Sequence, residues 1–112
     1  MERLEKLYRL LEAKNGQNTV IIDISEMATF ANYFIITGAM STPHLKQLKE
    51  EVKYDMKHEE DELPLSMEGD PASGWIIIDY NDIIVHCFSA EKREYYDLER
   101  IWGSGKRISF ED

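Results

Sequence analysis

The segment GWIIIDYNDIIVHCFSAEKREYYDLERIWG, residues 74–103, predicts two strands followed by a helix. Apolar side chains alternate in residues 75–80 and again in residues 83–88, which is the period of a β-strand. Asn81 lies between the two strands. Because asparagine tolerates the left-handed conformation of a tight turn, the two strands are expected to form a hairpin. Ser89 can cap the helix that follows.

Upstream of this segment, the chain predicts a helix and two strands. Leucines at positions 4, 7, 10 and 11 share one face of the first helix, which should end at residues 15–16. Residues 19–24 are rich in β-branched side chains and predict a strand. Residues 32–37 are apolar nearly throughout, so this second strand is expected at the centre of a sheet, covered on both faces.

A second helix is predicted to begin at Thr42-Pro43. Thr42 is expected to be its N-cap, and Pro43 to occupy the first helical position. The buried stripe of this helix should consist of Leu45, Leu48, Val52 and Met56. The same helical phase places His44 and His58 on the solvent side.

The remaining segments complete a fold prediction. Residues 63–67 alternate as in a strand, and Pro64 confines that strand to an edge of the sheet or to a bulge. The order of elements predicts an α+β domain over residues 1–103, in which a mixed sheet of about five strands carries packed helices. Residues 104–112 form a short polar tail, which we expect to be mobile or only loosely docked.

Composition and charge narrow the classes of function. The chain of 112 residues has 22 acidic and 13 basic side chains, and its net charge is −9. This charge disfavours non-specific binding to nucleic acid; it fits either solubility alone or steering toward a basic partner. Cys87 is the single cysteine, so neither a disulfide framework nor a zinc cluster is expected. With no recognisable signal peptide and no membrane-spanning apolar run, a cytoplasmic protein is expected.

One group of residues could hold a divalent metal. Asp79, Asp82 and His86 lie close together in the predicted hairpin, and Asp23 lies on another strand, which makes a metal-dependent nucleotidyltransferase the alternative function. Such an enzyme also needs a glycine-rich phosphate loop, and the sequence has none. Aspartates beside a turn commonly serve local hydrogen bonds. We therefore expect no catalytic residue, no metal and no cofactor.

The segment 74–103 also resembles a known family. It contains the pattern W-x3-D-x-x-D-x-x-V-H-x-F, followed by R-x-Y-Y-x-L-E-x-x-W. The matching residues are Trp75, Asp79, Asp82, Val85, His86, Phe88, Arg93, Tyr95, Tyr96, Leu98, Glu99 and Trp102. The pattern is similar to that of the bacterial ribosomal silencing factors, the RsfS or Iojap-related family. A weaker similarity extends the match to residues 3–103, with Asn32 in place of a usual aspartate and Pro43 in place of a common arginine.

This resemblance implies both a fold and a function. The fold would be a mixed sheet similar to the nucleotidyltransferase core. The function would be to bind large-subunit ribosomal protein number fourteen (uL14) on the face that meets the small subunit. A protein bound there blocks association of the two subunits and lowers translation when nutrients are short, without catalysis. An acidic chain should favour this basic protein contact over bare RNA.

Aromatic residues supply the expected contact surface, because they bury a large area at low entropic cost. The residues expected to contact the ribosomal protein are Trp75, Ile77, Asp79, Tyr80, His86, Arg93, Tyr95 and Tyr96. Leu98 and Trp102 are expected to belong to the core stripe of the last helix instead. An exposed aromatic face could also pair with itself, so a homodimer of the free protein is a third hypothesis.

Overall fold

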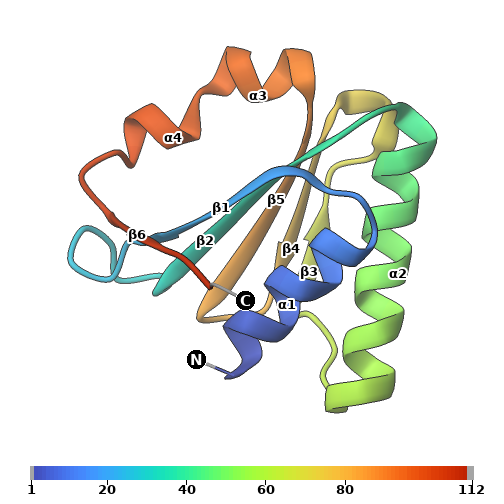
Figure 1. The fold of residues 1–112 in the computed structure, drawn as a ribbon, viewed down its shortest axis with the longest axis horizontal. Helices are drawn as coiled ribbons and strands as arrows, with labels where there is room; N and C mark the ends of the chain where they lie inside the picture. The colour runs from blue at the N-terminus through green and yellow to red at the C-terminus, as the bar shows by residue number, and fades with distance from the viewer. Residues whose placement is uncertain (1, 111–112) are drawn as a thin grey trace.

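The computed structural model describes residues 2–110, and it contains a six-stranded mixed sheet with helices packed on it (Figure 1). The elements in chain order are α1 (Glu2–Ala13), β1 (Gln17–Asp23), β2 (Tyr33–Ala39), α2 (Thr42–Glu60), β3 (Ser66–Glu68), the 3-10 turn η1 (Pro71–Ser73), β4 (Trp75–Asp79), β5 (Ile83–Ser89), α3 (Ala90–Tyr96), α4 (Leu98–Ile101) and β6 (Lys106–Ile108). The α+β class is confirmed, and the sheet has one strand more than expected.

The strand order is β3-β4-β5-β2-β1-β6. Strands β2 and β5 are parallel, and the other neighbouring pairs are antiparallel. Strand β2 lies inside the sheet, and every residue after Tyr33 in it is buried, as its continuous apolar run predicts. Strand β3 is an edge strand, as expected, but it begins at Ser66, so Pro64 precedes the strand instead of lying within it. The β4–β5 hairpin turns at Asn81, whose φ of 79° is left-handed.

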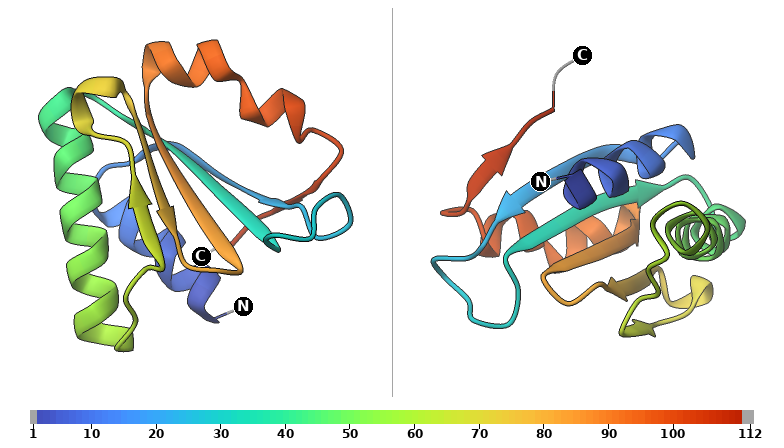
Figure 2. Two further views of the ribbon diagram at one scale, coloured as in Figure 1. Left: turned by 180° about the vertical axis from the view of Figure 1, so that it is seen from behind. Right: turned by 90° about the horizontal axis from the view of Figure 1, so that it is seen from below.

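The helices cover the two faces of the sheet unequally (Figure 2). Helices α1 and α2 pack their leucine-rich stripes on one face, in a large core that includes Ile78, Val85 and Cys87. Residues Leu98 and Trp102, from α4 and its end, pack on the other face in a smaller cluster around Phe34, Ile36 and Phe88. Leu98 and Trp102 therefore face the sheet, as expected, but they are only partly buried against the core. Within residues 2–110, no helix is long and apolar enough to cross a membrane.

The start of α2 differs from the prediction. Ser41, not Thr42, is the N-cap, and its hydroxyl accepts the His44 backbone N–H at 3.1 Å. His44 is buried rather than solvent-facing: its Nδ1 accepts the Met40 N–H at 2.9 Å, so its Nε2 donates to the Lys14 carbonyl at 2.8 Å. His44 thus joins the end of α1 to the start of α2, a tertiary contact that helical phase does not reveal.

The segment after residue 103 is docked, so the expectation of a mobile or loose tail is wrong. Lys106–Ile108 forms β6, which pairs antiparallel with β1. Ile108 and Phe110 pack against the larger core, and the Phe110 ring centroid lies 5.8 Å from that of Tyr8 in α1. A strand of three residues is too short to show periodicity. Residues 111–112 of the predicted tail lie outside the described residues.

The last predicted helix is interrupted at Asp97. Ser89 caps α3 as predicted, by accepting the Lys92 N–H at 3.2 Å. Asp97 then adopts a left-handed φ of 49°, which ends α3 and starts the short α4 in a new direction. This break separates Tyr95 from the stripe of Leu98 and Trp102, and Tyr95 is 75% exposed. The Asp97 break therefore turns one aromatic side chain out of the core and onto the surface.

Candidate protein-binding surface

A continuous row of rings crosses the face of the sheet on which α4 packs. In order, it consists of Tyr95, Tyr96, Trp75, His86, Phe34, Trp102 and Phe30, and we call this set the aromatic row. Successive ring centroids lie 5.0, 4.4, 5.9, 4.6, 5.2 and 6.1 Å apart. Its ends reach solvent, because Tyr95 is 75% exposed and Phe30 is 57% exposed. The middle of the row belongs to the core, so the exposed rings stand on a rigid base.

Trp75 connects the core to the exposed end of the row. Its ring stacks on Phe88, the cross-strand neighbour, with centroids 5.0 Å apart. Its indole Nε1–H donates to His86 Nδ1 at 3.1 Å. The side chain is partly buried, a position between the surface placement that we expected and a full core placement. Tyr96 lies against the same indole, with ring centroids 4.4 Å apart.

Two of the expected contact residues do not reach the surface. His86 is 5% exposed and Tyr80 is 2% exposed, so neither side chain can present area to a partner. Desolvation lowers the pKa of His86 to about 4 and raises the pKa of Tyr80. The strand alternation that puts Trp75 on one face puts Tyr80 on the other, with the larger core under α1 and α2. The strand alternation in the sequence was therefore enough to exclude Tyr80 from the contact surface.

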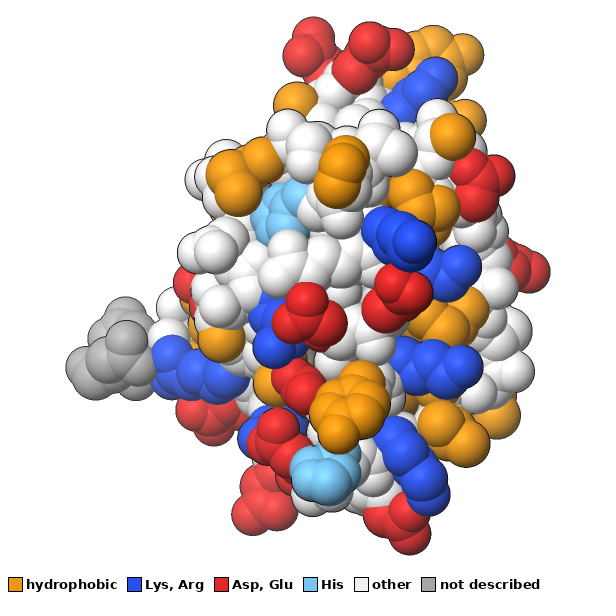
Figure 3. Space-filling model, turned by 90° about the vertical axis from the view of Figure 1, so that its right-hand side faces the viewer, with side chains coloured by type: hydrophobic (Ala, Val, Ile, Leu, Met, Phe, Trp, Pro, Cys, Tyr) orange, Lys and Arg blue, Asp and Glu red, His pale blue; other side chains and the backbone are white. Residues whose placement is uncertain are grey.

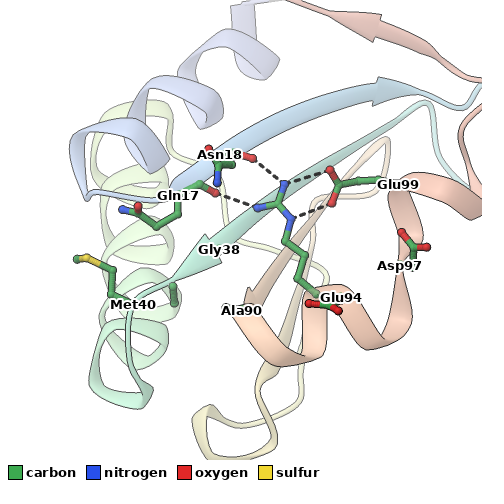
Figure 4. Close-up of a pocket in the computed structure, with 10 residues that line it drawn as sticks. Gln17, Asn18, Gly38, Met40, Ala90, Glu94, Asp97 and Glu99 are labelled. Atoms are coloured by element: carbon green, nitrogen blue, oxygen red, sulfur yellow. Dashed lines mark hydrogen bonds and ion pairs between the residues drawn. The ribbon is translucent and has the colours of Figure 1, made fainter.

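Arg93 holds α3 and α4 onto the sheet, and it lines the pocket that Figure 4 shows. Its Nε donates to Glu99 Oε1 at 2.8 Å, and its Nη1 and Nη2 donate to the carbonyls of Gln17 and Asn18 at 2.9 and 2.6 Å. These residues line a pocket of about 670 Å³ that also includes Met40. Because the Arg93 side chain is only 16% exposed and its fork is engaged within the chain, it positions the surface rather than supplying it.

The two aspartates of the hairpin are engaged within the chain, Asp79 in its own turn and Asp82 with α1. Asp79 Oδ1 accepts the Asn81 N–H at 2.7 Å within the turn. Both carboxylate oxygens of Asp82 accept from Arg3 Nη1 at 2.8 Å. Across residues 2–110, no three His, Cys, Asp or Glu side chains gather closely enough to hold a metal ion. Asp79 and Ile77 remain partly exposed beside Trp75, where they can contribute to a contact surface.

The sequence prediction missed the far end of the aromatic row. Phe30 lies in the connection between β1 and β2, and its ring contacts Phe34 and Trp102 at centroid distances of 6.1 and 6.1 Å. Ile101 in α4 is also 57% exposed. A large aromatic residue in a loop between two strands was the available signal, because such a side chain in a connection either docks on the core or marks a binding surface.

Comparison with known proteins gives consistent matches. The profile of a family described as RsfS, ribosomal silencing factor during starvation, matches residues 1–112. The chain is 30% identical over 90 residues to the ribosomal silencing factor RsfS of Bacillus subtilis, covering 80% of this chain and 75% of that one. It is 27% identical over 101 residues to the mouse protein named mitochondrial assembly of ribosomal large subunit protein 1, covering 88% of this chain and 44% of that one. A crystal structure of a Chromobacterium violaceum protein superposes with a TM-score of 0.80 at 27% identity, covering 96% and 92% of the two chains.

Proposed function

The chain belongs to the ribosomal silencing factor family, and from this premise we propose that it binds the large ribosomal subunit through uL14 and blocks association with the small subunit. The observation that carries the proposal is the exposed end of the aromatic row, where Tyr95 and Tyr96 lie beside the partly buried Trp75. Occupancy of the intersubunit face is the mechanism, so no bond is made or broken. Translation by cytoplasmic ribosomes falls as occupancy rises under nutrient limitation.

The chemistry of this surface fits a protein partner. Tyrosine and tryptophan are enriched at the centres of interfaces, because they bury large area and lose little side-chain entropy. Here the rings are already held by stacking and by the hydrogen bond from Trp75 to His86, so binding need not order them. Ile77 adds apolar area, and Asp79 adds a carboxylate that can meet a basic side chain. The net charge of −9 supports a basic ribosomal protein as the partner.

The test is co-sedimentation of the purified protein with isolated large ribosomal subunits, followed by addition of small subunits. Tyr95→Ala removes an exposed ring without opening the core, and loss of an interface hot spot costs about 2–4 kcal/mol, or roughly 30- to 1,000-fold in affinity. The matched control is Tyr54→Ala, because Tyr54 is 65% exposed on α2. Wild-type and control protein should pellet with large subunits and reduce subunit joining.

Two outcomes would count against the proposal. Full binding by the Tyr95→Ala protein would show that this end of the aromatic row is not the anchor. Failure of the wild-type protein to pellet at micromolar concentration would remove the ribosomal partner altogether. Self-association through the row is the competing use of the same surface, and light scattering on wild-type and Tyr95→Ala protein would detect a dimer that the substitution dissociates.

A further inference from the structure

A row of lysines runs along α2, on the opposite side of the sheet from the aromatic row. Lys46, Lys49, Lys53 and Lys57 follow each other at intervals of three and four residues, which places them on one helical stripe. At 1.5 Å per residue the stripe is about 16 Å long. Figure 3 shows this side of the molecule, where Lys and Arg side chains form a column with hydrophobic side chains beside it.

Three adjoining pockets lie between this stripe and the segment that contains β3. Their volumes are about 490, 330 and 320 Å³, and Lys53 lines all three. The apolar residues along them are Tyr54, Leu63, Pro64, Met67 and Pro71. Leu63 is 56% exposed, and the neighbouring Leu65 is 70% exposed. We call this feature the α2–β3 groove, and it combines an apolar floor with a basic wall.

Three of the four lysines of the groove have no partner among the described residues, whereas Lys57 pairs with Asp61. In the part of the chain that the structure describes, Lys46, Lys49 and Lys53 take part in no hydrogen bond or ion pair. By contrast, Lys14 pairs with Glu51 and Asp55 on another side of the same helix. Glu50 is the acidic residue within the groove. Three free ammonium groups in an otherwise acidic protein indicate a site for negative charge.

The wall opposite the lysines is a sheet edge. Strand β3 ends the strand order and pairs only with β4, so its outer edge meets no other strand within residues 2–110. An open edge can accept an added strand, which supplies backbone hydrogen bonds, while alternate side chains enter pockets on one side. The edge, the apolar floor and the lysine stripe lie together along one groove.

We propose that the α2–β3 groove binds an extended acidic segment of a second partner protein. The segment adds a strand to β3, places alternate apolar side chains against Leu63 and Met67, and pairs its carboxylates with the lysine stripe. A nucleic acid would use the lysines alone, leave the strand edge unpaired and meet the repulsion of a chain with net charge −9. Because the groove and the aromatic row lie on opposite faces of the sheet, the two partners do not compete, and this inference does not rest on the proposed ribosomal contact.

The probe is a short blocked peptide in which Asp alternates with Val, followed by NMR of the isotope-labelled protein. Saturable shifts are expected at the amides of Ser66–Glu68 and along the α2 stripe, and they should weaken as salt rises. A peptide with Lys in place of Asp should leave the spectrum unchanged. Lys49→Glu combined with Lys53→Glu should weaken binding by about tenfold or more, because two attractive contacts become repulsive. Lys106→Glu on β6 is the control, because it makes the same lysine-to-glutamate change outside the groove and should leave peptide binding unchanged.

Four results would overturn the inference. The first is an unchanged spectrum at millimolar acidic peptide. The second is a set of shifts confined to α2, without any change at β3, because that pattern means charge attraction without strand addition. The third is tighter binding of oligouridylate than of the peptide at the same lysines, which would assign the groove to nucleic acid. Binding by the doubly substituted protein at wild-type affinity, with its fold verified by circular dichroism, would equally exclude the lysine stripe.

Discussion

Protonation of one side chain, His86, makes the free energy of unfolding depend on pH. Its Nδ1 accepts the Trp75 indole N–H, while its buried Nε2 has no hydrogen-bond partner among the described residues. Burial lowers its pKa from 6.5 to about 4. Between these pKa values the unfolded chain binds a proton that the folded chain does not, so the free energy of unfolding falls as pH falls.

The contribution of His86 is fully present above pH 6.5 and is lost progressively toward the folded pKa. At about 1.4 kcal/mol per pKa unit, acidification from pH 6.5 to 5 should cost about 2 kcal/mol. Urea unfolding of wild-type protein at both pH values measures the loss. His86→Phe should be nearly insensitive over this range, and His58→Gln, which changes an exposed histidine, should keep the wild-type dependence. An unchanged slope in His86→Phe would assign the proton to another group.

At the scale of helices and strands, the Arg93 side chain fixes α3 and α4 to β1. Replacing it by methionine leaves the Glu99 carboxylate and the carbonyls of Gln17 and Asn18 without their donor. We expect Arg93→Met to lower the free energy of unfolding by about 2–3 kcal/mol, because partly buried polar groups lose their partners. Amide hydrogen exchange should also become faster in α3 and α4 than in β2.

Arg100→Met is the matched control for this element. Arg100 Nε donates to Asp97 at 2.8 Å, but the arginine side chain is 77% exposed. An exposed pair of this kind contributes about 0–1 kcal/mol, so the change should be small. Equal destabilisation by both substitutions would mean that the Arg93 contacts do not hold the helices in place.

Some elements of the fold are determined by their own residues, and others are determined by contacts with distant parts of the chain. The apolar run of β2, the Asn81 turn and the Ser89 cap were predictable because each depends on its own few residues. Strand β6 was not, since Lys106–Ile108 is defined by its pairing with β1. The burial of His44 was also missed, because its partners Lys14 and Met40 belong to neighbouring segments. Distant contacts of this kind override local periodicity.

In the candidate surface, too, some side-chain positions follow from local sequence and others depend on tertiary contacts. The exposure of Tyr95 depends on the left-handed Asp97, which interrupts an otherwise regular helical stripe. The role of Arg93 depends on carbonyl groups far away in sequence. Tyr80, in contrast, could have been placed in the core from strand alternation alone. The residue types at the surface were thus predictable, but which of them face solvent was decided by tertiary structure.

At the scale of the whole molecule, the two faces of the sheet have different surroundings. One carries the aromatic row beneath α4, and the other carries α1, α2 and the α2–β3 groove. An assembly in which one partner binds each face needs no conformational change in this chain, because the rings of the row are held by core contacts and β3 is already an open edge. Binding at one face should accordingly leave affinity at the other unchanged.

The net charge of −9 predicts how the protein approaches a large subunit. Two fields compete, since ribosomal RNA repels an acidic chain and a basic ribosomal protein attracts it. At physiological ionic strength the Debye length is about 8 Å, so the field within the last few ångströms before contact dominates. If the partner is a basic protein, the association rate should fall by about tenfold or more as salt rises from low to high concentration, with little change in dissociation. Stopped-flow binding of labelled protein measures both rates. An association rate that increases with salt would mean that RNA repulsion governs the encounter, and it would argue against a basic protein at the point of first contact.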